Sequence, residues 1–368
     1  MPHLNSSYNF KEILPHFGID GDSDVSRFGT GLINDTFSVN HPGGQKPEYL
    51  LQRVNHQIFK DVPSLMNNIA LVTSHINNKL KDSDKHQPDL VLTTDGKNYS
   101  LDASGNYWRV FRYMNNSRSY DAVESTKQAF EAGRAFGMFQ SMLSDLDTSL
   151  IKDSIPDFHN IGKRLTDLHK AVAADPQGRV EEVRDEIEFI REREKAMNVI
   201  PEMALKGLLP KRVTHGDTKF SNVLFNLNDE VQCVVDLDTV MVSYSAFDFG
   251  DAIRTIINSA AEDEKDLEKI RLNVPFFEAY AQGYLAEAIK FLTVEELNSL
   301  IHGALLLPYM QAVRFLTDYI EGDHYYKIKS PKHNLQRTRA QMKLVRKLEE
   351  ASPKLDSIIK EEARKLSL

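Results

Sequence analysis

The sequence of 368 residues has a single cysteine, Cys233, and no long apolar run. One cysteine excludes an intrachain disulfide and a thiolate metal cluster, and its setting in VQCVVDL favours a buried position. No segment approaches the ~20 apolar residues that a membrane-spanning helix needs. The first residues, MPHLNSSYNF, lack the basic and apolar regions of a signal peptide. We therefore expect a cytoplasmic protein with no membrane partner.

An excess of basic residues is also missing. The sequence has 45 Lys and Arg against 53 Asp and Glu, which gives a net charge of −8. Proteins that bind nucleic acid or anionic membranes usually carry a basic surplus, so neither partner is expected. A site for a few phosphate groups remains compatible with this composition, because such a site needs only local charges.

The pattern of apolar residues changes near residue 115. Before it, short segments typical of strands alternate with turn signals, and residues 62–80 have helical spacing. After it, most apolar residues recur at helical intervals, with a β-rich stretch around residues 213–237. The sequence therefore predicts a two-lobed α+β fold, with a small β-rich lobe over residues 1–114 and a larger, mostly helical lobe over residues 115–368.

One polar loop interrupts the β-rich stretch. In VTHGDTKFSNVLF, the residues between Val213 and Val223 are too polar for a buried strand, and such loops are where rigid scaffolds present chemistry. The next strand pattern, from Gln232 to Leu237, places Asp236 and Asp238 on one face. The hairpin between the two segments should bring Asn222 close to Asp236. Amide and carboxylate oxygens beside a further carboxylate, Asp217, suit Mg²⁺ and phosphoryl transfer.

The spacing of these residues resembles a known catalytic loop. Protein kinases carry H-R-D-x-x-x-x-N followed by a metal-binding Asp, and His215-Gly216-Asp217, Asn222 and Asp236 match that order with Gly in place of Arg. The H-G-D form resembles the aminoglycoside phosphotransferase and choline kinase group of small-molecule kinases. Within this group, the stretches TGLINDTF, LLQRVN, RYMNNSRSYD, HGDTKFSNVLF, VVDLDTVM and QAVRFLTDYIEGDHYYKIK look like the N-acetylhexosamine 1-kinases.

The resemblance implies ATP as co-substrate, Mg²⁺ as cofactor and a role for each loop residue. Asp217 is the expected catalytic base, and Asn222 and Asp236 are the expected metal ligands. Lys219 is a candidate for neutralising charge near the transferred phosphate, with a solvated loop lysine as the alternative. Asp238 is a candidate for binding metal through water, for binding substrate or for bonding the loop. His215 is expected to orient the loop.

The small lobe offers candidates for the nucleotide. Gly29, Thr30 and Gly31 lie in a glycine-bearing turn that would let the backbone approach phosphates, although a plain hairpin turn is the alternative. A protein kinase has a lysine on its third strand. Here EYLLQRVN offers Arg53, with Gln52 as the competing alignment. The backbone of Arg112 and Met114 is expected to face adenine.

The acceptor candidates lie in the large lobe. Arg314 and Asp318 are four residues apart and would share a helix face, either as a surface ion pair or as a lining for sugar hydroxyls. Tyr325, Tyr326 and Trp108 are candidates for stacking on a sugar ring, with a core position as the alternative.

Two classes of function follow. One is an ATP-dependent kinase of the anomeric hydroxyl of an N-acetylhexosamine, with another sugar, choline, homoserine or an aminoglycoside as other possible acceptors. The other is a catalytically silent nucleotide-binding module, against which the joint presence of Asp217, Asn222 and Asp236 argues. The expected protein is a monomer or a weak dimer.

Overall fold

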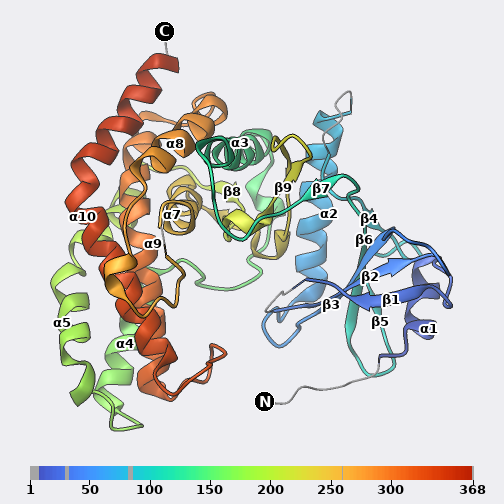
Figure 1. The fold of residues 1–368 in the computed structure, drawn as a ribbon, viewed down its shortest axis with the longest axis horizontal. Coiled ribbons are helices and arrows are strands. Elements are labelled where there is room, and N and C mark those ends of the chain that lie inside the picture. The colour runs from blue at the N-terminus through green and yellow to red at the C-terminus, as the bar shows by residue number, and fades with distance from the viewer. Residues whose placement is uncertain (1–7, 30–32, 82–85, 259, 367–368) are drawn as a thin grey trace. The chain divides into compact units, whose positions relative to one another are not determined.

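The computed structural model describes residues 8–29, 33–81, 86–258 and 260–366. The chain divides into two compact units, each with its own core (Figure 1). Unit 1 comprises Met1–Ser117, Ser149–Pro156 and Leu237–Val240, and unit 2 comprises Arg118–Thr148, Asp157–Asp236 and Met241–Leu368. Unit 1 is β-rich and unit 2 is mostly helical, as the sequence predicts. Two short segments from later in the chain also belong to unit 1, which no single boundary at residue 114 describes.

Unit 1 is built on an antiparallel sheet. Its strands follow the order β1-β2-β3-β6-β4, and β5 pairs with β6 as well. The strands are β1 (Asp24–Arg27), β2 (Asp35–Asn40), β3 (Tyr49–Val54), β4 (Leu90–Val91), β5 (Ser100–Leu101) and β6 (Tyr107–Arg112). The helical elements are α1 (Phe10–Ile13), the 3₁₀ turn η1 (Leu14–Phe17) and α2 (Val62–Lys79), and β7 (Ser117–Arg118) follows at the end of the unit's first segment.

The two faces of this sheet differ in what covers them. Trp108 and Val110 of β6 lie in an apolar core with residues of α1 and η1. Arg109, between them, points to the other face, because successive side chains of a strand alternate. There it contacts the sulfur of Met66 in α2, at 3.8 Å. Of the two positions open to Trp108, the structure shows the core position and not stacking on a sugar, since the indole is fully buried and donates to Asp102 at 2.9 Å.

Unit 2 surrounds a three-stranded sheet, in the order β10-β9-β7, and the pair β11-β8 with helices. The helices are α3 (Thr126–Met142), α4 (Ile161–Ala174), α5 (Arg184–Arg193), α6 (Val199–Leu205), α7 (Ser245–Ile256), α8 (Val274–Ala288), α9 (Val294–Glu321) and α10 (His333–Leu366). The strands are β8 (Arg212–Thr214), β9 (Val223–Asn226), β10 (Val231–Val234) and β11 (Met241–Ser243). β9 and β10 form an antiparallel hairpin, and β11 pairs with β8. No helix in the described part of the chain is long and apolar enough to cross a membrane.

Helix α7 lies against α9 at two glycines. A Cβ atom on Gly250 would come within 2.2 Å of the Gly303 carbonyl oxygen, and one on Gly303 within 1.9 Å of the Ala246 carbonyl oxygen. Such distances leave no room for a side chain, so the two backbones are in direct contact here. This contact fixes α7, the helix that supports the catalytic loop described below.

Two sequence predictions need correction. The pattern over Gln232–Leu237 predicts one strand, but β10 ends at Val234 and Asp236 adopts a left-handed conformation with φ of 63°. The chain then enters the 3₁₀ turn η6 (Leu237–Thr239). Asp236 and Asp238 therefore do not lie side by side on a strand. The helical spacing over residues 180–200 predicts one helix, but the structure has α5, the start of α6 and two 3₁₀ turns there.

Candidate active site

The polar loop begins directly after β8. His215 is fully buried, and its ring packs edge-on against Phe136 and Phe139 of α3, with centroids 5.7 and 5.5 Å apart. Its Nε2 lies 2.9 Å from the carbonyl oxygen of Val235. These contacts tie the loop to the segment that precedes Asp236 and agree with an orienting role for His215.

Helix α7 holds the loop backbone through Asp248. This buried carboxylate accepts hydrogen bonds from the backbone amides of His215 and Gly216, at 2.8 and 2.9 Å, and from Gln140 Nε2 at 2.8 Å. Gly216 adopts φ of 81°, a conformation that favours glycine. Burial raises the pKa of Asp248, although the amides and His215 oppose the shift. Asp248 therefore holds the loop backbone against α7, and its three hydrogen-bond donors fix the position of its carboxylate.

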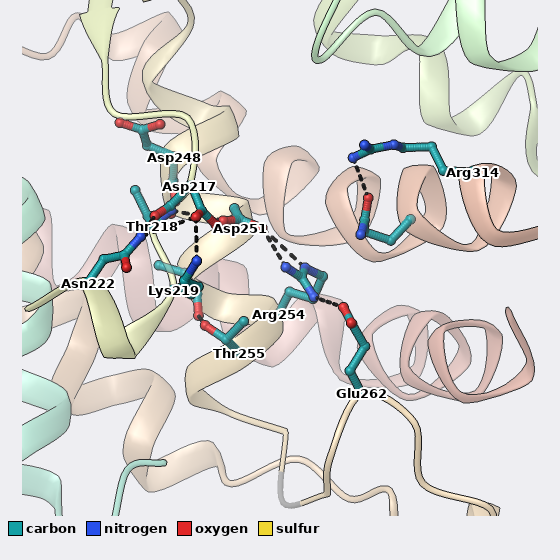
Figure 2. A network of polar contacts seen from close by, with 12 residues as sticks. Asp217, Thr218, Lys219, Asn222, Asp248, Asp251, Arg254, Thr255, Glu262 and Arg314 are labelled. Atoms are coloured by element: carbon teal, nitrogen blue, oxygen red, sulfur yellow. Dashed lines mark hydrogen bonds and ion pairs between the residues drawn. The ribbon is translucent and has the colours of Figure 1, made fainter. Parts of the chain in front are cut away.

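A second acid of α7 continues the support. Asp251 accepts the backbone amide of Thr218 at 2.9 Å and the guanidinium of Arg254 at 2.9 and 3.1 Å. Arg254 also binds Glu262 at 2.6 Å (Figure 2). Thr218 closes the arrangement by donating its hydroxyl to the Asp248 carbonyl oxygen at 2.6 Å. The sequence analysis missed this support, whose signal was a pair of acids three residues apart in the otherwise apolar FDFGDAI.

Asp217 lies at the centre of the loop and remains partly exposed. Its Oδ2 accepts hydrogen bonds from Lys219 Nζ at 2.6 Å and from Asn222 Nδ2 at 3.2 Å. Burial alone would raise the pKa of the Asp217 carboxyl, but the Lys219 ammonium outweighs it and holds the pKa below its usual value. No donor among the described residues contacts Oδ1. The carboxylate is therefore ionised and has one oxygen available.

Asn222 and Asp236 are brought together as the hairpin predicts. The amide of Val235 donates to the carbonyl oxygen of Asn222 at 2.8 Å. The Asn222 side chain donates through Nδ2 to the carbonyl oxygen of Asp217 at 2.8 Å, and its Oδ1 has no partner among the described residues. Asp236 is 44% exposed and its carboxylate lies 3.8 Å from Lys219 Nζ.

These two residues fit a magnesium–nucleotide site. Mg²⁺ in such sites takes one or two protein oxygens and completes its shell with waters and substrate phosphates. One amide oxygen without a protein partner and one exposed carboxylate meet that need. Among the described residues no three His, Cys, Asp or Glu side chains cluster as a metal site.

Asp238 has a different environment from Asp236. It is buried in unit 1, where both carboxylate oxygens bind the guanidinium of Arg109, one of them at 3.0 Å, and Oδ2 also accepts from Asn34 Nδ2 at 2.6 Å. Of the three roles open to Asp238, the structure favours a structural bond to its surroundings.

The expected small-lobe cation is placed differently from the prediction. Arg53 binds Asp35 at 2.6 Å and lies beside the Tyr8 ring, on the sheet face that carries Trp108. The cation on the opposite face is Arg109, whose Nε donates to Gln52 at 2.9 Å. Alternation along β3 explains the difference, because Gln52 is paired with Arg109 and Arg53 with Trp108.

The other nucleotide candidates are only partly described. Gly29 has φ of 69°, and a Cβ atom at this position would meet nothing within 4 Å, so the residue suits an open turn. Thr30 and Gly31 lie outside the described residues. The amide of Arg112 donates to Asp89 at 2.9 Å, and the carbonyl of Met114 accepts from Ser117 at 2.6 Å. Both of these backbone groups already have protein partners.

The acceptor candidates Arg314 and Asp318 do not pair. Arg314 binds Gln311 at 2.7 Å, and its guanidinium lies 5.5 to 5.8 Å from the rings of Phe158, Tyr325 and Tyr326. Asp318 is buried and accepts the backbone amides of Tyr325 and Tyr326 at 2.8 and 3.0 Å. Asp318 thereby fixes the turn after α9 that presents the two tyrosines to Arg314.

Comparison with known proteins agrees with this geometry. The model of the phosphotransferase enzyme family (APH) matches residues 24–292. The chain belongs to the phosphotransferase enzyme family. An aminoglycoside phosphotransferase from Alicyclobacillus acidocaldarius shares the fold with a TM-score of 0.63 and 13% identity, over 94% of this chain and 96% of that one.

Two further solved structures share this fold. A choline kinase from Cryptosporidium parvum has a TM-score of 0.55 and 12% identity, over 96% of this chain and 97% of that one. A streptomycin–ATP complex of APH(2″)-IIa has a TM-score of 0.55 and 15% identity, over 94% and 99% of the two chains. The two-lobed kinase-like α+β fold predicted from the sequence is thus confirmed.

Proposed function

We propose that this phosphotransferase uses ATP to phosphorylate the anomeric hydroxyl of an N-acetylhexosamine, such as N-acetylglucosamine or N-acetylgalactosamine. The acceptor oxygen forms a bond to the γ-phosphorus while the bond to the oxygen that bridges the β- and γ-phosphates breaks. The acceptor proton passes to Asp217 and ADP leaves. The products are a sugar 1-phosphate and ADP.

Asp217 carries this proposal. Its Oδ2 is fixed by Lys219 and Asn222, at 2.6 and 3.2 Å, which leaves Oδ1 to accept a hydrogen bond from the acceptor hydroxyl. An ionised carboxylate in this position orients the hydroxyl and then takes its proton. Lys219 is close enough to offset negative charge on the transferred group.

Asn222 Oδ1 and Asp236 are the residues that would hold Mg²⁺. When bound, the ion would offset charge on the β- and γ-phosphates of ATP. The ATP complex of APH(2″)-IIa supports ATP as the phosphate donor in this fold.

Two arginines, Arg314 and Arg164, lie close to His159 in the proposed acceptor region. His159 feels the charges of Arg314, Arg164 and Asp217, and burial together with the two arginines lowers its pKa to about 3. His159 is therefore neutral near pH 7, while the arginines remain charged. Choline and aminoglycosides, the substrates named for related structures, carry ammonium groups. Cationic acceptors would be repelled here, which favours a neutral acceptor.

Two buried polar groups at this site could also bind the acceptor. Arg164 Nε and the Tyr326 hydroxyl are buried and have no hydrogen-bond partner among the described residues. Unpaired buried donors are costly, at about 1–3 kcal/mol each, so a polar ligand is a reasonable partner for them. A sugar offers hydroxyl and amide oxygens, and its ring faces suit the aromatic side chains around Arg314.

An acceptor screen tests the proposal. ADP release is measured with N-acetylglucosamine, N-acetylgalactosamine, choline, ethanolamine and an aminoglycoside, and phosphorus NMR locates the new phosphate. We expect turnover of an N-acetylhexosamine to its 1-phosphate and none of its methyl glycoside, which has no free anomeric hydroxyl. A 6-phosphate product, or rapid turnover of choline without any sugar product, would refute the acceptor assignment.

One variant separates the acceptor site from the ATP site. Arg314→Ala should raise KM for the sugar at least ~10-fold, because a site built for polar groups discriminates strongly when one is removed. KM for ATP should stay within a factor of two. Arg191→Ala, which removes an exposed arginine of α5, is the matched control and should leave both constants unchanged.

A further inference from the structure

A fully buried ion pair crosses the interior of unit 1. The side chains of Arg109 and Asp238 are only 2% and 4% exposed. Each carboxylate oxygen of Asp238 binds a different Nη atom of Arg109, so the pair is bidentate. Bidentate pairs fix orientation as well as distance.

The rest of the Arg109 guanidinium is also bound. Its Nε donates to Gln52 Oε1 at 2.9 Å, and Gln52 Nε2 donates to Thr36 at 3.0 Å. The guanidinium lies 5.3 Å from the Phe111 ring and 3.8 Å from the Met66 sulfur. Arg109 is therefore held by Gln52 of β3, Met66 of α2 and Asp238 of η6, and it cannot turn towards another ligand without breaking these contacts.

Asn34 connects this pair to β2 and to the end of β3. Its Nδ2 donates to Asp238 at 2.6 Å, and its Oδ1 accepts the amide of Asn55 at 2.9 Å. Asn34 directly precedes β2, and Asn55 directly follows β3. A single carboxylate thus binds both Arg109 of the sheet and the residue that precedes β2.

The same carboxylate lies two residues after Asp236, the expected metal ligand. Asp236 is in a left-handed conformation, with φ of 63°, which a non-glycine residue adopts only when its surroundings hold it. After Asp238, the carbonyl of Val240 accepts from Asn68 of α2 at 3.4 Å. The segment directly after Asp236, the expected metal ligand, is therefore held in place by the contacts of Asp238 and Val240.

We infer that Arg109 and Asp238 are positioning residues for the magnesium–nucleotide site. By fixing Asp238, Arg109 sets the backbone on which Asp236 presents its carboxylate, and Asn34 holds the carboxylate of Asp238 from the start of β2. Replacing a buried ion pair by apolar residues of similar volume is often neutral or stabilising, so stability alone does not explain the charged pair. The fixed orientation of the two side chains does explain it. This inference rests on the metal site of the proposed function and is independent of the acceptor.

The experiment measures ATP binding by calorimetry with Mg²⁺ and with a chelator, in the full chain and without acceptor. Asp238→Asn and the double variant Arg109→Gln/Asp238→Asn are compared with wild type. The double variant keeps a neutral hydrogen-bonded pair and avoids an unpaired buried charge if the single variant does not fold. Loss of an outer partner of a metal ligand typically weakens metal affinity about 10–100-fold.

We expect Mg²⁺ to strengthen ATP binding at least ~10-fold less in these variants than in wild type, with metal-free ATP binding within a factor of two. Asp102→Asn is the matched control. It disturbs a carboxylate that binds Trp108 in the same sheet at 2.9 Å, and it should lower Tm without changing the effect of Mg²⁺.

Asp236→Ala distinguishes the possible failures. If Asp236→Ala loses the effect of Mg²⁺ while both pair variants keep it, the positioning role is refuted and the metal site stands. If wild-type binding does not depend on Mg²⁺, the metal site and the positioning role are refuted together. A fall in Tm alone, with the Mg²⁺ effect unchanged, would also refute the inference, because it would show a purely structural pair.

Discussion

At the scale of single residues, the charge state of Asp217 decides the chemistry. A buried carboxyl would normally be hard to ionise, and here the neighbouring ammonium of Lys219, at 2.6 Å, reverses that tendency. Lys219 in turn lies between Asp217 and Asp236, whose charges raise its own pKa against the effect of burial. Asp217 and Lys219 thereby hold each other in the charged form.

Replacement of the base is the first test at this scale. Asp217→Asn keeps the size and the hydrogen bonds of the side chain but cannot take the acceptor proton. We expect kcat to fall at least ~10²-fold, the usual contribution of a general base, while the Kd for ATP stays nearly unchanged. Steady-state kinetics and calorimetry measure both. A kcat within a factor of a few of wild type would remove Asp217 from this role.

Replacement of the neighbouring lysine should change the pH profile. Since Lys219 lowers the pKa of Asp217, Lys219→Met should raise that pKa. The acidic limb of the kcat profile should then move to higher pH, because Asp217 acts only when ionised. Lys219→Arg keeps the charge and is the control, in which the limb should stay near its wild-type position. If the acidic limb does not move in Lys219→Met, the limb belongs to the titration of a group other than Asp217.

At the scale of elements, hydrogen bonds to α7 hold the proposed catalytic loop in place. Two carboxylates of one helix, Asp248 and Asp251, accept hydrogen bonds from three backbone amides of the loop. These are the amides of His215, Gly216 and Thr218. The helix itself is fixed by its backbone contact with α9 at Gly250 and Gly303. The position of Asp217 therefore depends on a helix–helix contact formed by residues that never touch substrate.

A methyl group at this contact should disturb both stability and activity. In Gly303→Ala the new Cβ would come within 1.9 Å of the Ala246 carbonyl oxygen, so the two helices must separate. We expect a loss of about 1–3 kcal/mol in the free energy of unfolding, as for other overpacked cores, and a lower kcat because α7 moves with its carboxylates. Urea denaturation and steady-state kinetics measure the two effects.

The matched control uses a glycine with room around it. Gly162 lies in α4, where a Cβ would meet nothing closer than 3.5 Å. Gly162→Ala should leave the free energy of unfolding unchanged or raise it by up to about 1 kcal/mol, since alanine favours helices. Equal effects of the two substitutions would show that the α7–α9 contact tolerates separation.

The sequence predicts elements and local spacing well, and packing less well. The loop with Asp217 and Asn222 could be recognised because the spacing along the chain sets its geometry. The role of Asp248 could not, since it depends on how α7 packs against the loop. The choice between Gln52 and Arg53 depended on which face of β3 meets α2, and the buried residues of that strand do not alternate strictly with exposed ones. Asp238 was misplaced because the strand ends earlier than its apolar residues suggest.

At the scale of the whole molecule, the negative net charge of −8 contrasts with the local charge of the acceptor site. Arg164 and Arg314 lie close enough to His159 to lower its pKa, and Arg254 adds to the effect. The arginines around His159 should therefore affect the stability of the protein.

The pH dependence of stability should report this arrangement. The pKa of His159 is lowered from 6.5 to about 3 by burial, Arg314 and Arg164, so between these values the unfolded chain binds a proton that the native protein does not. Stability should accordingly fall as the pH drops below about 6.5, by up to about 1.4 kcal/mol per pH unit from this residue. Between pH 6.5 and about pH 5.5 the full loss from this residue would be about 1 kcal/mol, and partial exposure of the ring should make the measured loss smaller. His159→Gln removes the titrating group, and urea denaturation at both pH values should show a smaller loss in the variant. An identical loss in wild type and variant would mean that His159 titrates normally and that the arginines do not act on it.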